Sequence, residues 1–213
     1  MMALIRTYLP IFSVGILVVL YTVGIWGLNS GHRDWFLAAT PLTLVLSTGF
    51  LLLNHQGWNG RFLAGMAFCC LSGFFIEVLG VRTGLIFGNY AYGETLGLQV
   101  WEVPLVIGLN WLLLLYTTSS LAERLALPKA VQAGLAALAM TLLDVLIEPV
   151  AMRLDFWQWE DGRVPLQNFM AWFLVSLVLI LLLRGFGFEK RNPIAAALLL
   201  LQFFFFGTLN LSL

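Results

Sequence analysis

The chain has 213 residues and no net charge; 61% of its residues are hydrophobic and only 10% are charged. Soluble domains carry about 25% charged residues, so this composition excludes an ordinary soluble protein and predicts an integral membrane protein. The few Lys and Arg residues are scattered along the chain, which excludes the basic surface that a nucleic-acid-binding protein needs.

Seven apolar stretches predict transmembrane helices, because about 20 apolar residues cross a bilayer as a helix. Together they predict an all-α, polytopic membrane protein with a single helical domain over residues 1–213. Pro104 and Pro165 are expected in the first turns of two of these helices, where a missing N–H is tolerated. The seven predicted spans are 8–28, 36–53, 62–81, 102–121, 130–152, 165–184 and 193–212.

The Lys and Arg residues are unevenly divided between the two ends of these predicted helices. Cytoplasmic loops carry an excess of positive charge, so the more basic end predicts the inner side. The N-terminus is therefore expected in the cytoplasm, in a multi-pass protein of the cell membrane. The more basic end has Arg6, Arg61, Arg124, Lys129, Arg184, Lys190 and Arg191, and the other has Arg33, Arg82, Arg153 and Arg163.

The sequence contains an internal repeat. An acidic residue followed by Val-Leu, then an aromatic linker, then Val-Pro-Leu with a Trp seven positions after the Pro, occurs twice. We predict two parallel helical hairpins, over approximately 62–121 and 130–184, formed by the third and fourth and the fifth and sixth helices. The matched residues are Glu77, Pro104 and Trp111 in the first copy and Asp144, Pro165 and Trp172 in the second.

Three acids lie inside predicted spans: Glu77, Asp144 and Glu148. A charged side chain at mid-membrane costs roughly 2.5–3.5 kcal/mol on insertion scales, so such residues usually face a bundle interior and serve function. Asp144 and Glu148 are four residues apart and share one helix face. We predict that the three acids are catalytic. The alternative is that they are hydrogen-bonded struts between helices, with Asn110, Gln167 or Asn168 as partners.

Aromatic residues are concentrated in and around the two linkers. One interpretation is an interfacial belt of Trp and Tyr. The other is that the rings bind the substrate and stabilise a carbocation by cation–π attraction. For the second interpretation the candidate substrate-binding residues are Tyr90, Tyr92, Trp101, Trp111, Trp157, Trp159, Asn168 and Trp172.

No cofactor or metal is expected from the motifs. His32 and His55 have no second ligand at metal-binding spacing, and no Gly-rich dinucleotide or phosphate-binding loop is present. Buried acids that can hold a proton, beside an apolar substrate, are the minimum equipment for adding water to a carbon–carbon double bond.

Several segments resemble the membrane-integral carotenoid 1,2-hydratases of the CruF type. The likeness covers residues 72–175, about half of the chain. It implies a cofactor-independent hydro-lyase that hydrates the acyclic ψ end of γ-carotene, lycopene or a related carotenoid. The implied partners of the enzyme are membrane lipid and other carotenoid-pathway enzymes. The segments that carry the resemblance are 77–84, 87–92, 103–105, 144–149, 157–159 and 164–173.

The residues and this implied reaction suggest a mechanism. Protonation of the terminal C1=C2 bond gives a tertiary cation, which water captures as a tertiary alcohol. Asp144 or Glu77 is the expected acid, and Glu148 is expected to hold the water. Three alternatives remain: a lycopene-type cyclase that begins with the same protonation, a proton-coupled transporter, and a non-catalytic carotenoid-binding protein.

Overall fold

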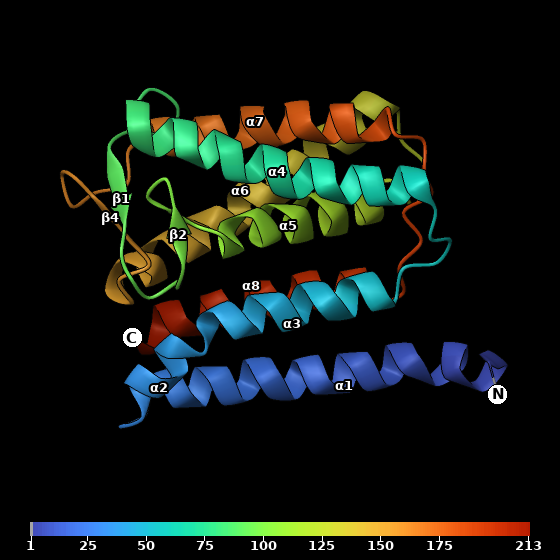
Figure 1. Cartoon of the computed structure of the whole chain (residues 1–213), viewed down its shortest axis with the longest axis horizontal. Helices are drawn as coiled ribbons and strands as arrows, with labels where there is room; N and C mark the ends of the chain where they lie inside the picture. Colours follow the sequence, from blue (N-terminus) through green and yellow to red (C-terminus); the bar gives the residue numbers. More distant parts are fainter. Residues whose placement is uncertain (1) are drawn as a thin grey trace.

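The protein is an α-helical membrane protein. The computed structural model describes residues 2–213, with side chains described from Tyr8 onward, so Arg6 of the charge comparison lies outside the described side chains. Eight helices form one bundle in the described range (Figure 1). They are α1 (Met2–Leu28), α2 (Arg33–Ala38), α3 (Thr40–Leu53), α4 (Gly60–Thr83), α5 (Val106–Ala122), α6 (Lys129–Arg153), α7 (Leu166–Arg184) and α8 (Ala195–Ser212).

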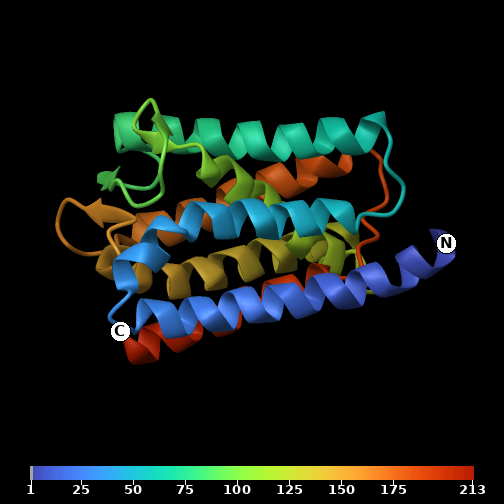
Figure 2. The same cartoon turned by 60° about the horizontal axis from the view of Figure 1, so that its bottom comes forward.

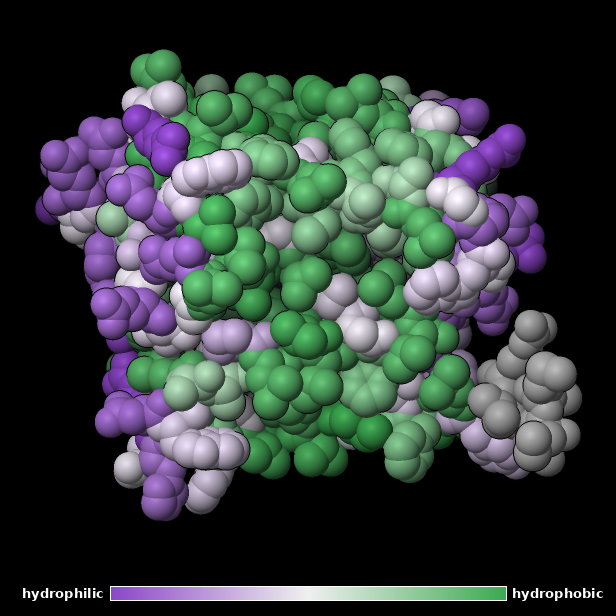
Figure 3. Space-filling model, in the orientation of Figure 1, coloured by the Kyte–Doolittle hydropathy of each residue, from purple (hydrophilic) through white to green (hydrophobic). Residues whose placement is uncertain are grey.

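Apolar side chains cover the middle of the molecule, and hydrophilic residues gather at its two ends (Figure 3). Within the described chain, five helices are long and apolar enough to cross a membrane: α1, α4, α6, α7 and α8. The apolar helices α3 and α5, with 14 and 17 residues, are shorter than the usual span. The membrane class is therefore confirmed, while the number of seven spans and the internal repeat stay predictions.

Two predicted helix starts were wrong. The predicted span 36–53 is divided at Ala39 into α2 and α3, because Pro41 has no N–H to continue the hydrogen-bond ladder. The predicted span 102–121 begins only at Val106, and Pro104 lies in a short strand instead of a helical turn. Pro165 is the residue that caps the start of α7.

α5 is the central helix of the bundle. It packs against α3, α4, α6, α7 and α8, and most of its residues are buried. α1 lies at the edge of the bundle, against α3 and α8 (Figure 2). A helix that is apolar all round fits such a central position. The bundle therefore places Trp111 of α5 deep inside, between α4 and α7.

Four short strands lie at one end of the bundle, which we call the strand end (Figure 1). β1 (Tyr90–Tyr92) pairs antiparallel with β4 (Trp157–Trp159), and β2 (Gln99–Val100) pairs with β3 (Val103–Pro104). The β1–β4 pair joins the two aromatic linkers. Its register sets Tyr90 opposite Trp159 and Tyr92 opposite Trp157. The strand pairing thus gathers rings from two distant segments over the ends of α4 and α6.

Candidate active site

The three predicted acids are all buried, at 4% exposure or less, near the strand end of α4 and α6. Their polar partners are neutral aromatic or amide groups. Glu77, Glu148 and their ring neighbours line one small cavity of about 20 Å³. A water molecule needs about 10–15 Å³ of such space, so the cavity has room for about one water.

Glu77 accepts hydrogen bonds from three side chains. The Tyr90 and Tyr92 hydroxyls bond to Oε2, at 2.8 Å for Tyr92, and the Trp111 indole N–H bonds to Oε1 at 3.0 Å. An indole N–H can only donate, whereas a phenol can donate or accept. The Oε2 atom of Glu77 can therefore share a proton with two hydroxyl groups.

Glycines on α4 make room for these partners. Gly73, Glu77 and Gly80 lie on one helix face at spacings of four and three residues. A Cβ atom at Gly73 would overlap the Trp111 side chain, and one at Gly80 would lie 3.0 Å from the Tyr90 hydroxyl. The absence of side chains one turn before and after Glu77 thus lets the rings approach its carboxylate.

Burial favours the protonated form of the two phenols further. It raises the pKa of Tyr90 and of Tyr92 well above 10, and the neighbouring Glu77 carboxylate adds to the effect. Both hydroxyls therefore keep their protons at neutral pH and remain available as hydrogen-bond donors to Glu77.

Glu148 is held by donors that cannot accept a proton in return. The indole N–H groups of Trp157 and Trp159 bond to its Oε2 at 2.9 and 2.8 Å, and the Asn168 amide bonds to its Oε1 at 3.1 Å. Three donors of this kind match a carboxylate, which only accepts. Glu148 is therefore built as a fixed acceptor at the cavity wall.

Asp144 lies beside this cavity but is not part of its lining. The Asn168 amide donates to its Oδ2 at 2.9 Å, so one amide joins Asp144 to Glu148. The other oxygen, Oδ1, is buried without a hydrogen-bond partner among the described residues. Asp144 and Glu148 share a helix face as predicted, yet it is Glu148 that shares the cavity with Glu77.

The aromatic residues form a cage around the acids. The matched residues Trp111 and Trp172 stack face to face, with ring centroids 4.5 Å apart and an interplanar angle of 13°. Tyr90 packs against Trp159 at 5.0 Å. The cavity lining contains seven of the eight predicted substrate-binding residues: Tyr90, Tyr92, Trp111, Trp157, Trp159, Asn168 and Trp172.

The structure does not bring Trp101 to this site. Its backbone has a positive φ of 53°, in the turn between β2 and β3, and its ring is 51% exposed against Phe75. This position fits the interfacial interpretation of the aromatic residues. Of the proposed partners of the acids, Asn168 is confirmed, while Gln167 instead donates to the backbone carbonyls of Leu85 and Ile86.

Three lining residues were not among the predicted substrate-binding residues: Phe87, Ile107 and Asn110. Ile107 lies on α5 four residues before Trp111, on the same helix face, so its spacing to Trp111 was an available signal, whereas Asn110 directly precedes Trp111 in the sequence. Among the described residues, no group of three or more His, Cys, Asp or Glu side chains is arranged to hold a metal ion.

Residues 36–213 match the family of carotenoid biosynthesis proteins. Over 151 residues the chain is 34% identical to the bisanhydrobacterioruberin hydratase of Haloarcula japonica, an alignment that covers 61% of this chain and 47% of that relative. The chain thus spans about half the length of this relative. No solved structure is significantly similar to this chain.

Proposed function

This chain belongs to the carotenoid biosynthesis protein family, and we propose that it is a carotenoid hydratase whose active site is the cavity between Glu77 and Glu148. The family match confirms the resemblance to CruF-type carotenoid hydratases seen in the motifs. The observation that carries the proposal is a water-sized cavity lined by two buried carboxylates and by seven aromatic rings, which come from both linkers and from α5 and α7.

The reaction adds water across the terminal C1=C2 bond of an acyclic ψ end. A proton from Glu77 bonds to C2 and leaves C1 as a tertiary cation. The oxygen of a water then bonds to C1, and one of its protons passes to Glu148. The atoms balance as alkene plus water giving a tertiary alcohol, and the proton returns from Glu148 to Glu77 to restore the starting state.

The hydrogen bonds support this division of roles. Glu77 can hold the proton, because two of its three partners are hydroxyl groups that accept as well as donate. Glu148, held by three donors, offers a carboxylate that stabilises the cation and orients the water. The ring faces of the cage stabilise the same cation, at roughly 0.5–2 kcal/mol for each well-placed ring.

Asp144 supports Glu148 in this proposal. Because the Asn168 amide bridges the two acids, Asp144 fixes the position of the amide that holds Glu148. From the sequence alone, either Asp144 or Glu77 was the expected proton donor. Because Glu77 lines the cavity and Asp144 does not, we propose Glu77 as the donor.

The substrates implied are γ-carotene, lycopene or a related carotenoid with a ψ end. We propose a location in the cell membrane with the strand end outside, because the described cations Arg61, Arg124, Lys129, Arg184, Lys190 and Arg191 belong to the opposite end. The catalytic cavity then lies in the outer half of the bilayer.

Pigment analysis tests the function directly. The chain is expressed in a host that makes lycopene or γ-carotene, and the pigments are separated and weighed by mass spectrometry. A hydratase gives a product heavier by one water, a cyclase gives a product of unchanged mass, and a transporter or binding protein gives no new pigment. Glu77→Gln should lower hydrated product at least about 100-fold, the usual lower bound for removing general acid catalysis.

The level of inserted protein, measured in the same membranes, separates lost chemistry from lost folding. Full activity of Glu77→Gln at normal protein level would rule out Glu77 as the proton donor.

A further inference from the structure

A second, larger cavity of about 310 Å³ lies between α1, α2, α3, α5 and α8. Its lining is almost entirely apolar: aliphatic side chains come from α1 and α3, and Phe205 and Phe206 come from α8. An apolar pocket of this size is at the small end of the range seen for ligand sites. The catalytic cavity described above has room for about one water molecule, so most of the substrate must be held in another space.

The two cavities share a wall. Ile107, Asn110 and Trp157 line both of them. The Trp157 indole also donates to Glu148, so the wall is attached directly to a catalytic acid. Because these three side chains line both spaces, the shortest route from the apolar space to the acids passes them.

The larger cavity is open to the lipid side of the bundle. Among its lining residues, Val19 and Val23 of α1 and Leu42 of α3 are exposed by 61%, 45% and 57%. These side chains lie in the apolar band of a membrane protein, where exposure means contact with lipid. An apolar molecule dissolved in the bilayer can therefore reach the cavity between α1 and α3 without crossing water.

We propose that this cavity binds the isoprenoid chain of the substrate next to its reacting end, and that the chain enters sideways from the bilayer between α1 and α3. This inference rests on the proposed function. The reacting end passes the wall of Ile107, Asn110 and Trp157 to reach the acids, while the remainder of the long polyene stays in the lipid. The cavity volume suits a chain segment and excludes a whole carotenoid.

A matched pair of substitutions on α3 tests the proposal. Leu44 lines the cavity, and Val45, its neighbour, is 46% exposed and does not line it. Leu44→Trp fills the space with a ring, whereas Val45→Trp places the same ring in lipid. Leu44→Trp should lower hydrated product at least tenfold in the pigment assay, and Val45→Trp should leave it within twofold of the unmodified chain.

Binding is measured separately from catalysis. The Glu77→Gln protein, purified in detergent from a lycopene-producing host, should carry lycopene visible in its absorption spectrum. The added Leu44→Trp change should remove most of that pigment, and Val45→Trp should not. Both double variants are compared at equal amounts of folded protein.

The outcomes separate the two proposals. If the unmodified chain hydrates carotenoid and Leu44→Trp does so equally well with equal bound pigment, the cavity is not the substrate site, while the proposed function stands. If pigment binds in the Leu44-dependent way but no hydrated product forms, the cavity proposal stands and the proposed function fails. Equal loss in Leu44→Trp and Val45→Trp, at normal protein level, also overturns the cavity proposal.

Discussion

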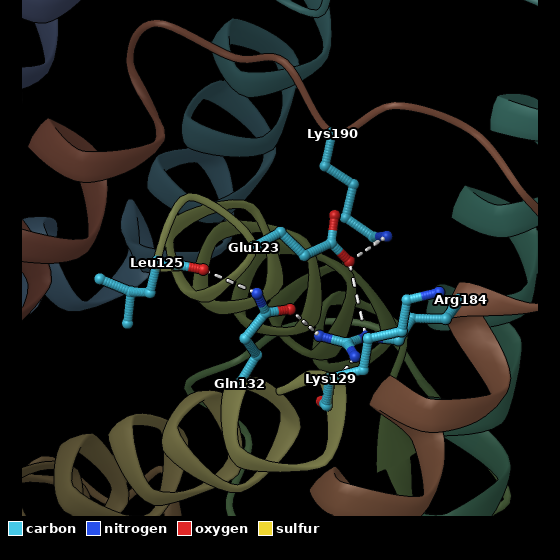
Figure 4. A network of polar contacts seen from close by, with 6 residues as sticks. All are labelled: Glu123, Leu125, Lys129, Gln132, Arg184 and Lys190. Atoms are coloured by element: carbon cyan, nitrogen blue, oxygen red, sulfur yellow. Dashed lines mark hydrogen bonds and ion pairs between the residues drawn. The ribbon is translucent and has the colours of Figure 1, made fainter. Parts of the chain in front are cut away.

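The two ends of the bundle hold acidic side chains in opposite ways. At the end opposite the strands, Glu123 bonds to the Lys190 ammonium at 2.7 Å and lies 3.7 Å from Arg184 (Figure 4). At the strand end, the hydrogen-bond partners of Glu77 and Glu148 among the described residues are phenols, indoles and an amide, all neutral.

The contacts around Glu123 are those of a structural network. Arg184 also bonds to Gln132 at 2.8 Å and to the backbone carbonyl of Lys129, and Gln132 bonds to the carbonyl of Leu125 (Figure 4). These bonds join the end of α5, the start of α6 and the end of α7. Glu123 has two basic side chains beside it, which suits a fixed tie between helices.

Neutral partners leave an acid able to exchange protons. A phenol or indole stabilises a carboxylate by hydrogen bonding without adding a compensating charge. The comparison therefore predicts that chemistry is confined to the strand end, and that the network around Glu123 contributes to stability.

The largest contrast is expected between two substitutions of the same type. Glu148→Gln removes the carboxylate that holds water and stabilises the cation, and should lower hydrated product about 100-fold or more. Glu123→Gln should leave the activity per folded protein within twofold, and should lower the melting temperature in detergent because it leaves Lys190 buried without its counter-ion. Pigment mass spectrometry and thermal unfolding measure the two effects. Equal activity losses in the two variants would contradict the comparison.

A smaller effect is expected from the stacked tryptophans. Trp111→Phe keeps a ring but removes the N–H that bonds to Glu77, and should lower activity up to about tenfold, since an ordinary hydrogen bond contributes about 0.5–1.5 kcal/mol. Trp172→Phe keeps a ring in the same stack and should lower activity less than threefold, because no hydrogen bond joins its indole to an acid among the described residues. Initial rates at matched protein levels distinguish them. Similar losses in both variants would show that ring size matters more than the bond to Glu77.

The smallest effect concerns His55, at the end opposite the strands. Its Nδ1 lies 2.6 Å from the Tyr116 hydroxyl and its ring stacks on Phe62 at 3.6 Å. Burial lowers the pKa of His55 below its usual value of about 6.5. Because the folded state takes up the proton less readily than the unfolded state, stability is complete above about pH 7 and decreases as the pH falls below 6.5.

Unfolding of the detergent-solubilised protein between pH 7.5 and 5 measures this dependence. In His55→Phe, the loss of stability between pH 7.5 and 5 should be smaller by the part that His55 contributes. Hydration activity at pH 7.5 should be retained. An unchanged profile in His55→Phe would assign the acid sensitivity to other groups.

The sequence predicted which residues make up the site better than it predicted how they are arranged. An acid inside an apolar stretch stands out without any knowledge of the fold, and Glu77, Asp144 and Glu148 are all buried as expected. The division of roles among them was not visible. Asp144 and Glu148 differ by a single helical turn, and only the packing of α6 against α7 and β4 decides which of them reaches the cavity.

The aromatic residues show the same limit. Local composition marks both linkers as aromatic, but a ring in a linker can face lipid, water or the interior. The pairing of β1 with β4 turns Tyr90, Tyr92, Trp157 and Trp159 inward, while the turn between β2 and β3 leaves Trp101 outside. Strand register between distant segments depends on the whole fold, so it could not be read from either linker alone.

Hydropathy along the chain was enough to determine that this protein is a bundle of helices in a membrane, because the bilayer forces every apolar stretch to satisfy its own backbone hydrogen bonds. It also marked the acids, because charge in hydrocarbon is costly wherever it occurs. Only the tertiary structure decided that Glu77 and Glu148 face one water-sized space, that neutral donors surround them, and that an apolar cavity lies across a shared wall. Those features depend on contacts between segments far apart in sequence, from α1 to α8 for the apolar cavity, which no local pattern specifies.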